Sequence, residues 1–569
     1  MAETVVSRRW RESRRAFDVE QIAVATLACL ALAAGAWIMY EGRGLIFFYD
    51  EWDWVLRRRD GLDGLFRPHN GHFSLVPVLV FKALFATVGV EHYWVYRLAG
   101  VLAHLLCVGL LFALVRRHLG VGLALAAAAV LLVLGAAWQV ILWPFEISYL
   151  CSIAAGLGAL LALDRGSRRG DRVAAALVFV ALASSGLGLA VACGVLAELL
   201  FAPARRVVRR AWVALAPLTL YAVWYVIVLP DGQAKRGNID AVPGYVGEAA
   251  AGAIGAVTGL GLELGRVLLV IAAIVVIRRL VAPGPLPARL IGVLTMGLVY
   301  WALVALARAD LQEPLASRYV YFGAVIVLLI GVHSARHITL APRAWILVGL
   351  AVGASMLSNL GDLRDGANSL RETTGSLRAA LAAVELAGDA VPATTAPEST
   401  AAPQVTAGPY RKLVADLGSP VGGPANVLAD GPASAVAVDA ALARVLGVAA
   451  LPAGEAGVGN ASAEDPPSVV AIGGRARVDG SCVRYAPAGP GAALDVMLPA
   501  GGSIVLRDAK APAELRLRRM SAAFSSGPIG SVAAGGAVEL AVPGDRIARP
   551  WVLRVSSAGS LQACTGVPR

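Results

Sequence analysis

Three carboxylates lie close together near the start of the chain, in the segment GLIFFYDEWDW. Asp50 and Glu51 are adjacent, Asp53 follows two residues later, and a long apolar run precedes all three. Ionisable groups beside a bilayer core are costly and tend to be functional. A carboxylate there can act as a general base or hold a cation. The alternative is a solvated loop that Trp52 and Trp54 anchor at the membrane interface.

The segment RPHNGHFSLVP supplies the next group of polar side chains, His69, Asn70 and His72. On a helix the two histidines would share a face, and together with an acid they could bind a divalent metal. Pro68 and Gly71 instead favour a turn. We therefore expect these side chains to line a substrate site by hydrogen bonding, without a metal or other cofactor. A divalent metal bound by the two histidines stays open as the alternative.

Two arginines and a tyrosine form the third group. Arg308 lies in RADLQEP, and Arg318 and Tyr319 lie in SRYVYF at the start of an apolar run. A guanidinium group binds phosphate oxygens in bidentate fashion, so this group predicts a clamp for an anionic headgroup. The alternative is that the arginines only reach from the membrane to the interface.

A strongly apolar chain has to position these groups. Of its 569 residues, 57% are hydrophobic and 16% are charged, and the mean hydropathy is +0.68. Soluble globular chains have about 45–50% apolar and about 25% charged residues. The sequence therefore predicts a polytopic α-helical membrane protein. Most basic residues lie in short loops between apolar runs, so topology explains the net charge of +11 and no nucleic-acid partner is expected.

About eleven transmembrane helices are predicted, from runs that approach the roughly 20 residues needed to cross a bilayer. Arginine-rich segments precede the first run and follow every second run after it, which places these segments and the N-terminus in the cytoplasm of a multi-pass plasma-membrane protein. The runs are 21–41, 97–115, 121–138, 146–163, 173–186, 187–201, 211–229, 252–277, 288–307, 319–333 and 343–357.

Residues 73–90 form a further apolar stretch in the first outer loop. A full crossing there would invert the arginine pattern downstream. We therefore expect a re-entrant or interfacial segment, with a twelfth span as the alternative.

The chain after residue 358 is expected outside the cytoplasm. Short alternating runs separated by turn residues every 8–12 positions are typical of a β-sandwich of about 100 residues. The Pro/Thr/Ala composition of residues 391–407 predicts a linker without a core. The predicted parts are a cytoplasmic segment 1–20, a transmembrane domain 21–357 with a long outer loop 42–96, a helical and linker region 358–466, and a β-sandwich 467–569.

Cys482 and Cys564 are the only cysteines of the C-terminal region. An even pair in an oxidising compartment indicates a disulfide, here one that joins the first and last strands of the sandwich. Two buried free thiols are the alternative.

The motifs YDEW, HNGHFSLVP and SRY, in this order among many apolar runs, resemble the GT-C superfamily of integral-membrane glycosyltransferases. The likeness covers about residues 20–335 and is nearest to the PMT/ArnT-like branch and its actinobacterial relatives. The resemblance implies a polyprenyl-phosphate sugar donor, reached from the membrane, and inversion at the anomeric carbon without a metal. Some mycobacterial arabinosyltransferases also carry a C-terminal carbohydrate-binding module.

The resemblance also implies roles for individual residues. Asp50 matches the catalytic base that activates an acceptor hydroxyl, and Glu51 would assist it. Arg318 and Tyr319 match best the group that holds the lipid phosphate, followed by Arg308. Asp53, His69, Asn70 and His72 are assigned only as substrate-lining residues.

Three functions compete on this basis. The first is a glycosyltransferase acting on a cell-envelope glycan, lipid or protein. The second is a lipid-sugar transporter or flippase, which would need charged or broken helices near the middle of the membrane. The third is a non-catalytic envelope scaffold, because a β-sandwich does not by itself imply sugar binding.

Overall fold

The computed structural model describes residues 2–58, 61–202, 209–229, 231–335, 340–452, 466–525 and 527–565, with side chains from residue 19 onward. The chain divides into two compact units. The first comprises Met1–Gly44, Arg58–Thr87 and Trp94–Leu370, and the second comprises Leu45–Arg57, Val88–Tyr93 and Arg371–Arg569.

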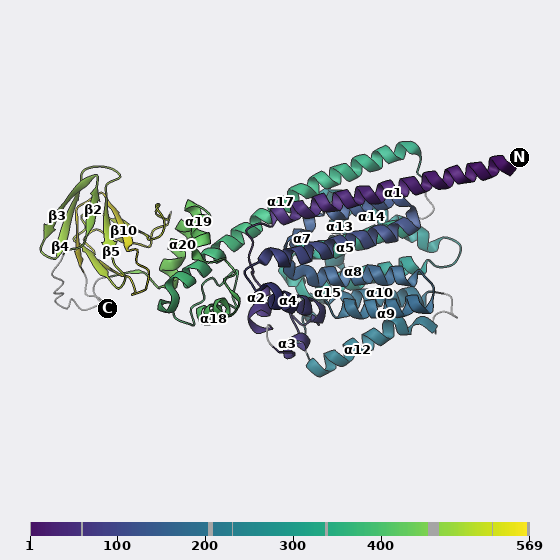
Figure 1. Cartoon of the computed structure of the whole chain (residues 1–569), viewed down its shortest axis with the longest axis horizontal. Helices are drawn as coiled ribbons and strands as arrows, with labels where there is room; N and C mark the ends of the chain where they lie inside the picture. The colour runs from purple at the N-terminus through teal and green to yellow at the C-terminus, as the bar shows by residue number, and fades with distance from the viewer. Residues whose placement is uncertain are drawn as a thin grey trace. The chain divides into compact units, whose positions relative to one another are not determined.

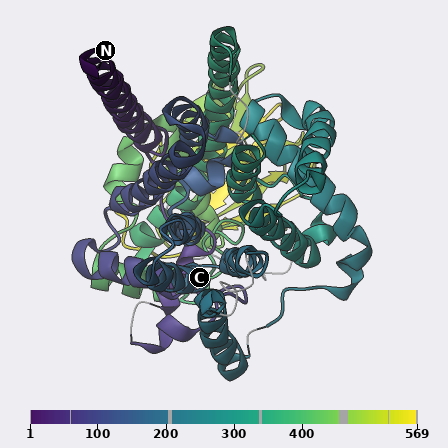
Figure 2. The same ribbon diagram turned by 90° about the vertical axis from the view of Figure 1, so that its right-hand side faces the viewer.

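The first unit is a bundle of helices, which Figure 1 shows from the side and Figure 2 along the helices. Its elements are α1 (Ala2–Glu41), α3 (Asp63–Phe66), α4 (Leu75–Val88), α5 (Tyr93–Leu119), α6 (Val121–Leu132), η1 (Gly135–Ala137), α7 (Trp138–Leu142), η2 (Pro144–Glu146), α8 (Ile147–Leu163), α9 (Arg168–Leu182), α10 (Leu187–Leu200), α12 (Trp212–Val228), η3 (Arg236–Ala241), α13 (Val242–Thr258), α14 (Gly261–Val281), α15 (Ala288–Arg308), η4 (Ala309–Leu311), α16 (Ser317–Ser334) and the first part of α17 (Pro342–Ala387).

The length and apolar composition of the helices in this unit are those of a polytopic membrane protein. Six of the described helices are long and apolar enough to cross a membrane, and the number rises to eight when each of two bent pairs counts as one span. Large apolar side chains such as Leu220, Ile227, Val267, Ile271 and Leu347 are exposed on α12, α14 and α17. Such a surface is favourable against lipid and would be costly in water.

The predicted spans all fall on helices, but several differ from single crossings. Helices α9, α10 and α12 have only 15, 14 and 17 residues, so they are shorter than the roughly 20 residues of a full span. Residues 121–138 bend by 46° between α6 and α7. The count of about eleven therefore exceeds the six to eight spans supported by helix length.

The prediction of one helix at 252–277 is wrong. Helices α13 and α14 meet there at a bend of 106°, between Gly259 and Gly261, whose φ angles are +71° and +73°. Glycine adopts this left-handed backbone conformation without steric cost, which ends α13. Gly265 lets the two helices cross closely, since a Cβ atom there would lie 2.2 Å from the Ala251 carbonyl oxygen.

The apolar stretch 73–90 contains α4, a helix of 14 residues. At 1.5 Å per residue it is about 21 Å long, which is less than the roughly 30 Å of a hydrocarbon core. Phe81 and Phe85 of α4 pack against Tyr96 of α5. The stretch is therefore a short packed helix, as a re-entrant or interfacial segment requires.

The arginine-bearing ends of the helices gather at one end of the bundle. Arg289 at the start of α15 pairs with Asp164 after α8 at 2.9 Å and with Glu198 of α10 at 2.6 Å. Arg210, just before α12, pairs with Asp171 of α9 at 2.6 Å. These pairs bring together the ends to which the arginine pattern assigned the same side of the membrane. They also show that the predicted runs 173–186 and 187–201 correspond to two antiparallel helices, α9 and α10.

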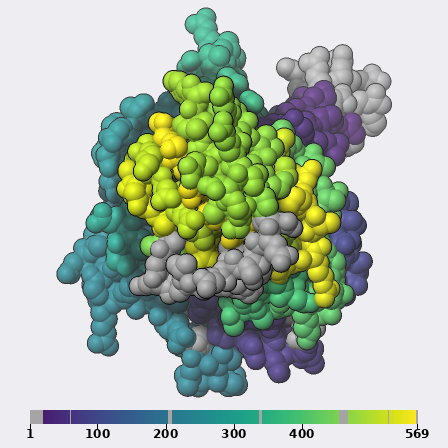
Figure 3. Space-filling view, turned by 90° about the vertical axis from the view of Figure 1, so that its left-hand side faces the viewer, coloured from purple at the N-terminus to yellow at the C-terminus, as the bar shows by residue number. Residues whose placement is uncertain are grey.

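The second unit combines short helices with a β-sandwich, whose surface Figure 3 shows in green and yellow. Its helices are α2 (Glu51–Arg57), the rest of α17, η5 (Gly388–Ala390), α18 (Ala407–Leu417), α19 (Pro424–Ala429) and α20 (Pro432–Val445). Its strands are β1 (Ala450–Pro452), β2 (Val469–Ile472), β3 (Gly474–Asp479), β4 (Cys482–Pro487), β5 (Ala493–Leu498), β6 (Ser503–Arg507), β7 (Ala513–Arg518), β8 (Gly530–Val532), β9 (Val538–Ala541), β10 (Trp551–Ser557) and β11 (Leu561–Thr565).

The strands form two antiparallel sheets, as the alternating pattern predicts. One sheet has the order β1-β9-β6-β11-β4-β3 and the other has the order β2-β5-β10-β7-β8. Trp551, Leu553 and Val555 of β10 are fully buried, and the residues between them are half-buried. This period of two places one face of the strand in the core between the sheets.

Residues 391–407 are not a linker without a core. Val391, Ala402 and Val405 are fully buried, and the Ala407 N–H donates to the Thr395 carbonyl at 2.9 Å. The proline-rich segment does not form an extended spacer. It supplies turns, and the small apolar side chains between them pack within the second unit.

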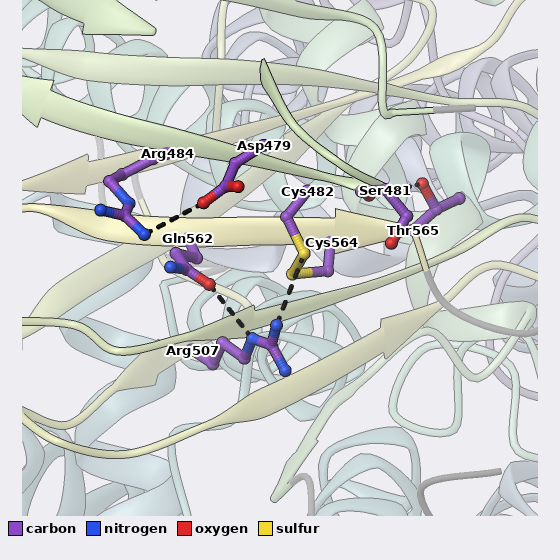
Figure 4. The surroundings of a disulfide bond; sticks show 8 residues. All are labelled: Asp479, Ser481, Cys482, Arg484, Arg507, Gln562, Cys564 and Thr565. Carbon is purple, nitrogen blue, oxygen red and sulfur yellow. Dashed lines mark hydrogen bonds and ion pairs between the residues drawn. A yellow bond between two sulfur atoms is a disulfide. The ribbon is translucent and has the colours of Figure 1, made fainter. Parts of the chain in front are cut away.

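Cys482 and Cys564 are bonded to each other. They lie directly opposite one another on the neighbouring strands β4 and β11, with Arg507 beside them (Figure 4). The expectation that the bond joins the first and last strands is wrong in part. Strand β11 is the last, but β4 follows β2 and β3, because the sheet order places β4 and β11 side by side.

Candidate functional site

The adjacent acids Asp50 and Glu51 have different surroundings in the second unit. The Glu51 side chain is fully buried and accepts hydrogen bonds from the Phe48 N–H at 3.1 Å and the Tyr93 hydroxyl at 3.0 and 3.1 Å. Asp50 is half-buried and lies one residue before α2. Asp50 is thus the more exposed acid of this pair, while Glu51 is fixed in the protein interior.

The neighbouring tryptophans are core residues rather than interface anchors. Trp52 and Trp54 are 0% and 1% exposed, and Trp52 meets Phe47 and Tyr410 edge-on at 6.2 and 6.1 Å between ring centroids. The interface prediction is wrong because the tryptophans face the packed interior of the second unit. Asp53 is partly exposed and lies 3.7 Å from Arg57 one helical turn later, a surface pair of little energetic weight.

The histidine segment belongs to the first unit and forms a tight turn. The backbones of His69 and His72 exchange two hydrogen bonds of 2.9 Å, and Asn70 and Gly71 between them have φ angles of +48° and +75°. These angles are typical of a type I′ turn, in which asparagine followed by glycine is favoured. The histidines therefore do not share a helix face.

Arg58, which the sequence analysis did not single out, holds the start of this turn. Its guanidinium group donates to the carbonyl oxygens of Arg67 at 2.8 Å and Pro68 at 2.6 Å. His69 is buried there against Phe145. In the part of the chain that the structure describes, no group of three His, Cys, Asp or Glu residues is arranged to hold a metal ion.

Arg308 and His72 line one pocket of the bundle, with a volume of about 270 Å³. The Arg308 guanidinium lies 3.4 Å from the Gln233 side-chain oxygen, and no carboxylate within the described ranges is at ion-pair distance from it. Burial, followed by the proximity of His69 and Arg308, lowers the pKa of His72 to about 4. Other polar residues of the lining are Tyr149, Ser185, Tyr221, Tyr225, Asp231, Tyr300 and Tyr319.

The loop after α12 positions Arg308 by binding the end of α15. Lys235 donates a backbone hydrogen bond to the Leu306 carbonyl at 2.9 Å and forms a 2.7 Å ion pair with Asp310. Asn238 donates to the same carbonyl at 3.1 Å and to Asp310 at 3.2 Å. Lys235 and Asn238 thus bind the Leu306 carbonyl and the Asp310 carboxylate, which lie on either side of Arg308 in the chain. They hold the end of α15 in place and neutralise Asp310, so this carboxylate does not pair with the Arg308 guanidinium.

Arg318 lines a different pocket from Arg308, with a volume of about 570 Å³. Its guanidinium lies 3.8 Å from Glu313 and 4.9 Å from the centre of the Tyr319 ring. Tyr319 follows Arg318 in α16 but lines the Arg308 pocket. Tyr319 thus lines the Arg308 pocket while its ring also contacts the Arg318 guanidinium, and Glu313 is the carboxylate paired with Arg318.

Asp50 and Glu51 belong to the second unit, whereas the histidines and arginines belong to the first. Sequence reasoning missed Gln139 and the pair Asp362 and Asp365, which line the Arg318 pocket. The spacing GDLRD carries a signal for this pair, because acids three residues apart on a helix share a face.

No protein-family model and no curated protein matches the chain. Among solved structures, the chain is similar to the cryo-electron-microscopy structure of arabinosyltransferase EmbB from Mycobacterium smegmatis, at 14% sequence identity and a TM-score of 0.35. The match covers 95% of this chain and 64% of that chain, so this chain spans less than two thirds of that protein's length.

Proposed function

We propose that this protein is a membrane glycosyltransferase that moves a sugar from a polyprenyl-phosphate donor to a hydroxyl of a cell-envelope acceptor. The observation that supports it most is the Arg308 pocket, where a guanidinium group without a carboxylate partner in the described residues lies at the end of a membrane helix. A phosphate that carries a lipid chain needs such a cation beside an apolar surface. Exposed Leu220 and Ile227 on α12, whose Tyr221 and Tyr225 line the pocket, supply that surface.

The chemistry we propose is an inverting displacement. Asp50 takes the proton of the acceptor hydroxyl, and the hydroxyl oxygen attacks the anomeric carbon on the face opposite the phosphate. The bond between the anomeric carbon and the phosphate oxygen breaks, and its electron pair leaves with the phosphate. Arg308 stabilises the negative charge that develops there. His72, neutral near pH 7 because of its lowered pKa, leaves this arginine as the pocket's cation.

Glu51 has a supporting role in this mechanism. Its two oxygens are held by Phe48 and Tyr93, so it fixes the start of α2, directly after Asp50. We therefore assign Glu51 as a positioning residue for Asp50.

The proposed topology follows the arginine pattern. The end of the bundle that carries Arg117, Arg210 and Arg289 is proposed to face the cytoplasm together with the N-terminus, because short cytoplasmic loops are enriched in basic residues. The ends with Arg308 and Arg318 and the β-sandwich then lie outside. Cysteine labelling of single-cysteine variants at exposed Asp240 and Arg169 would test this, with opposite accessibility expected.

The base assignment is tested by Asp50→Asn in membranes supplied with polyprenyl-phosphate sugars. We expect transfer to fall about 10²- to 10⁴-fold, the usual contribution of a general base. Asp63→Asn is the control, since Asp63 is an exposed acid of the same outer loop that has no assigned role in the mechanism. Unchanged sugar transfer by the Asp50→Asn variant would show that Asp50 is not the general base.

A lipid-sugar transporter is the second candidate, favoured by the breaks at α6/α7 and α13/α14. Broken helices are common at the substrate sites of transporters. Reconstituted vesicles with a fluorescent polyprenyl-phosphate sugar distinguish the two functions. Translocation without transfer, unaffected by Asp50→Asn, would favour the transporter.

A further inference from the structure

The pocket beside Arg318 differs in lining from the Arg308 pocket. Its volume of about 570 Å³ lies within the roughly 300–1,000 Å³ of small-molecule sites. It is an open hollow bordered by η1 and α7, the turn before α16, the start of α16, and α17. The polar and aromatic residues of the lining are Trp138, Gln139, Glu313, Ser317, Arg318, Asp362, Asp365 and Ser369.

The walls of this pocket are fixed to one another. The Gln139 N–H donates to the Ser317 hydroxyl oxygen at 3.1 Å, and the Arg318 N–H donates to the Gln139 side-chain oxygen at 3.2 Å. Trp138 lies on Gly366 of α17, where an added Cβ atom would be 2.2 Å from the indole ring. These contacts preorganise three of the four walls, so a ligand would bind without first ordering them.

Several hydrogen-bonding groups of the lining are not used by the fold. Asp362 and Asp365 lie three residues apart on α17 and share one face. Both carboxylates are exposed to solvent, and neither has a hydrogen bond or ion pair among the described residues. The Gln139 side-chain oxygen is taken by Arg318, while its amide nitrogen has no partner in the same ranges.

This combination favours a neutral polyol. Three carboxylates against one guanidinium group disfavour an anion, and the polar lining disfavours a lipid chain. Sugar hydroxyls can donate to Asp362 and Asp365 and accept from Arg318, and the C–H face of a sugar ring packs well on an indole. No three His, Cys, Asp or Glu residues in the described ranges are grouped for a metal ion.

We propose that the Arg318 pocket binds a neutral, hydroxyl-rich sugar unit. Sugar binding there does not depend on catalysis. The further assignment of this pocket as the acceptor site rests on the proposed function, in which the lipid phosphate occupies the separate Arg308 pocket.

The test is saturation-transfer NMR on the full chain in lipid nanodiscs, prepared without sugar-headed detergent. The probes are the methyl glycosides of glucose, mannose, galactose, arabinose and rhamnose. We expect at least one to bind, and Asp362→Asn and Asp365→Asn each to weaken it about tenfold, as expected for loss of a charge-assisted hydrogen bond. Asp240→Asn, an exposed acid of the first unit outside both pockets, is the control and should bind as the wild type does.

The outcomes separate this inference from the proposed function. Failure of all five glycosides to bind, or binding that both aspartate variants retain, overturns the inference. Calcium binding in calorimetry that Asp362→Asn removes, without any glycoside binding, overturns it in favour of a cation site. Glycoside binding by a protein that transfers no sugar supports the inference and refutes the proposed function.

Discussion

The Tyr93 hydroxyl donates to both carboxylate oxygens of Glu51, at 3.1 and 3.0 Å, across 42 positions of sequence. The same carboxylate accepts from the Phe48 N–H, and Phe47 packs edge-on against the Tyr93 ring at 4.7 Å between centroids. This contact joins the residues before α2 to the start of α5. It fixes the backbone next to Asp50.

Tyr93→Phe tests the importance of this contact. The variant keeps the ring but removes one donor from a buried carboxylate, which costs about 1.5–3 kcal/mol of unfolding free energy when the partner is charged. We expect a lower midpoint of thermal unfolding for the purified protein. Tyr40→Phe, at a 58% exposed tyrosine, should leave the midpoint unchanged. Equal midpoints for both variants would show that the Tyr93 hydroxyl does not support Glu51.

The different surroundings of Asp50 and Glu51 could not be predicted from their sequence. Both are acids that follow a long apolar run, and the local sequence pattern treats them alike. What separates them is Tyr93, a contact between residues far apart in sequence. Trp52 shows the same limit, since composition predicts an interface anchor, whereas Tyr410 of α18 covers it in the structure.

Hydrophobic periodicity predicted the helices well and their breaks poorly. The hydropathy averaged over residues 252–277 is high, and the average hides Gly259 and Gly261. Two glycines two residues apart are themselves a signal for a turn. The reverse error occurred at 391–407. There the composition predicted no core, but Val391 and Val405 are small enough to pack between the turns that the prolines make.

Arg308→Gln should weaken the binding of the donor more than Arg318→Gln does. Arg308 has no carboxylate partner among the described residues, while Arg318 lies near Glu313. Charged hydrogen bonds to a phosphate correspond to about 10- to 100-fold in affinity. The measurement is the KM for a polyprenyl-phosphate sugar, or the Kd of polyprenyl phosphate alone. Arg278→Gln, on the exposed end of α14, is the control. A larger effect at Arg318 would reverse the assignment of the phosphate site.

The lowered pKa of His72 predicts a dependence of stability on pH. The folded protein keeps His72 neutral down to about pH 4, whereas the unfolded chain takes up its proton near pH 6.5. Unfolding is therefore favoured progressively as the pH falls from 6.5 to 4, and the loss is complete below the folded pKa. A shift of about 2.5 units at 1.36 kcal/mol each gives at most about 3 kcal/mol.

His72→Gln isolates this contribution. The variant lacks the titrating ring, so its unfolding midpoint should fall less than that of the wild type between pH 6.5 and 4. His92→Gln controls for the general effect of acid and should follow the wild type. If His72→Gln lost stability as steeply as the wild type, another group would carry the dependence.

Gly366 and Gly361 provide a matched test of how closely α17 packs on α7. A Cβ atom at Gly366 would lie 2.2 Å from the Trp138 ring, whereas one at Gly361 meets no atom within 4 Å. Gly366→Ala should displace Trp138 and lower the unfolding free energy by about 1–3 kcal/mol, the usual cost of overpacking. Gly361→Ala on the same helix should instead stabilise by up to about 1 kcal/mol, because alanine favours the helix. Thermal unfolding of the two variants gives opposite shifts if α17 packs on Trp138, and the same shift if it does not.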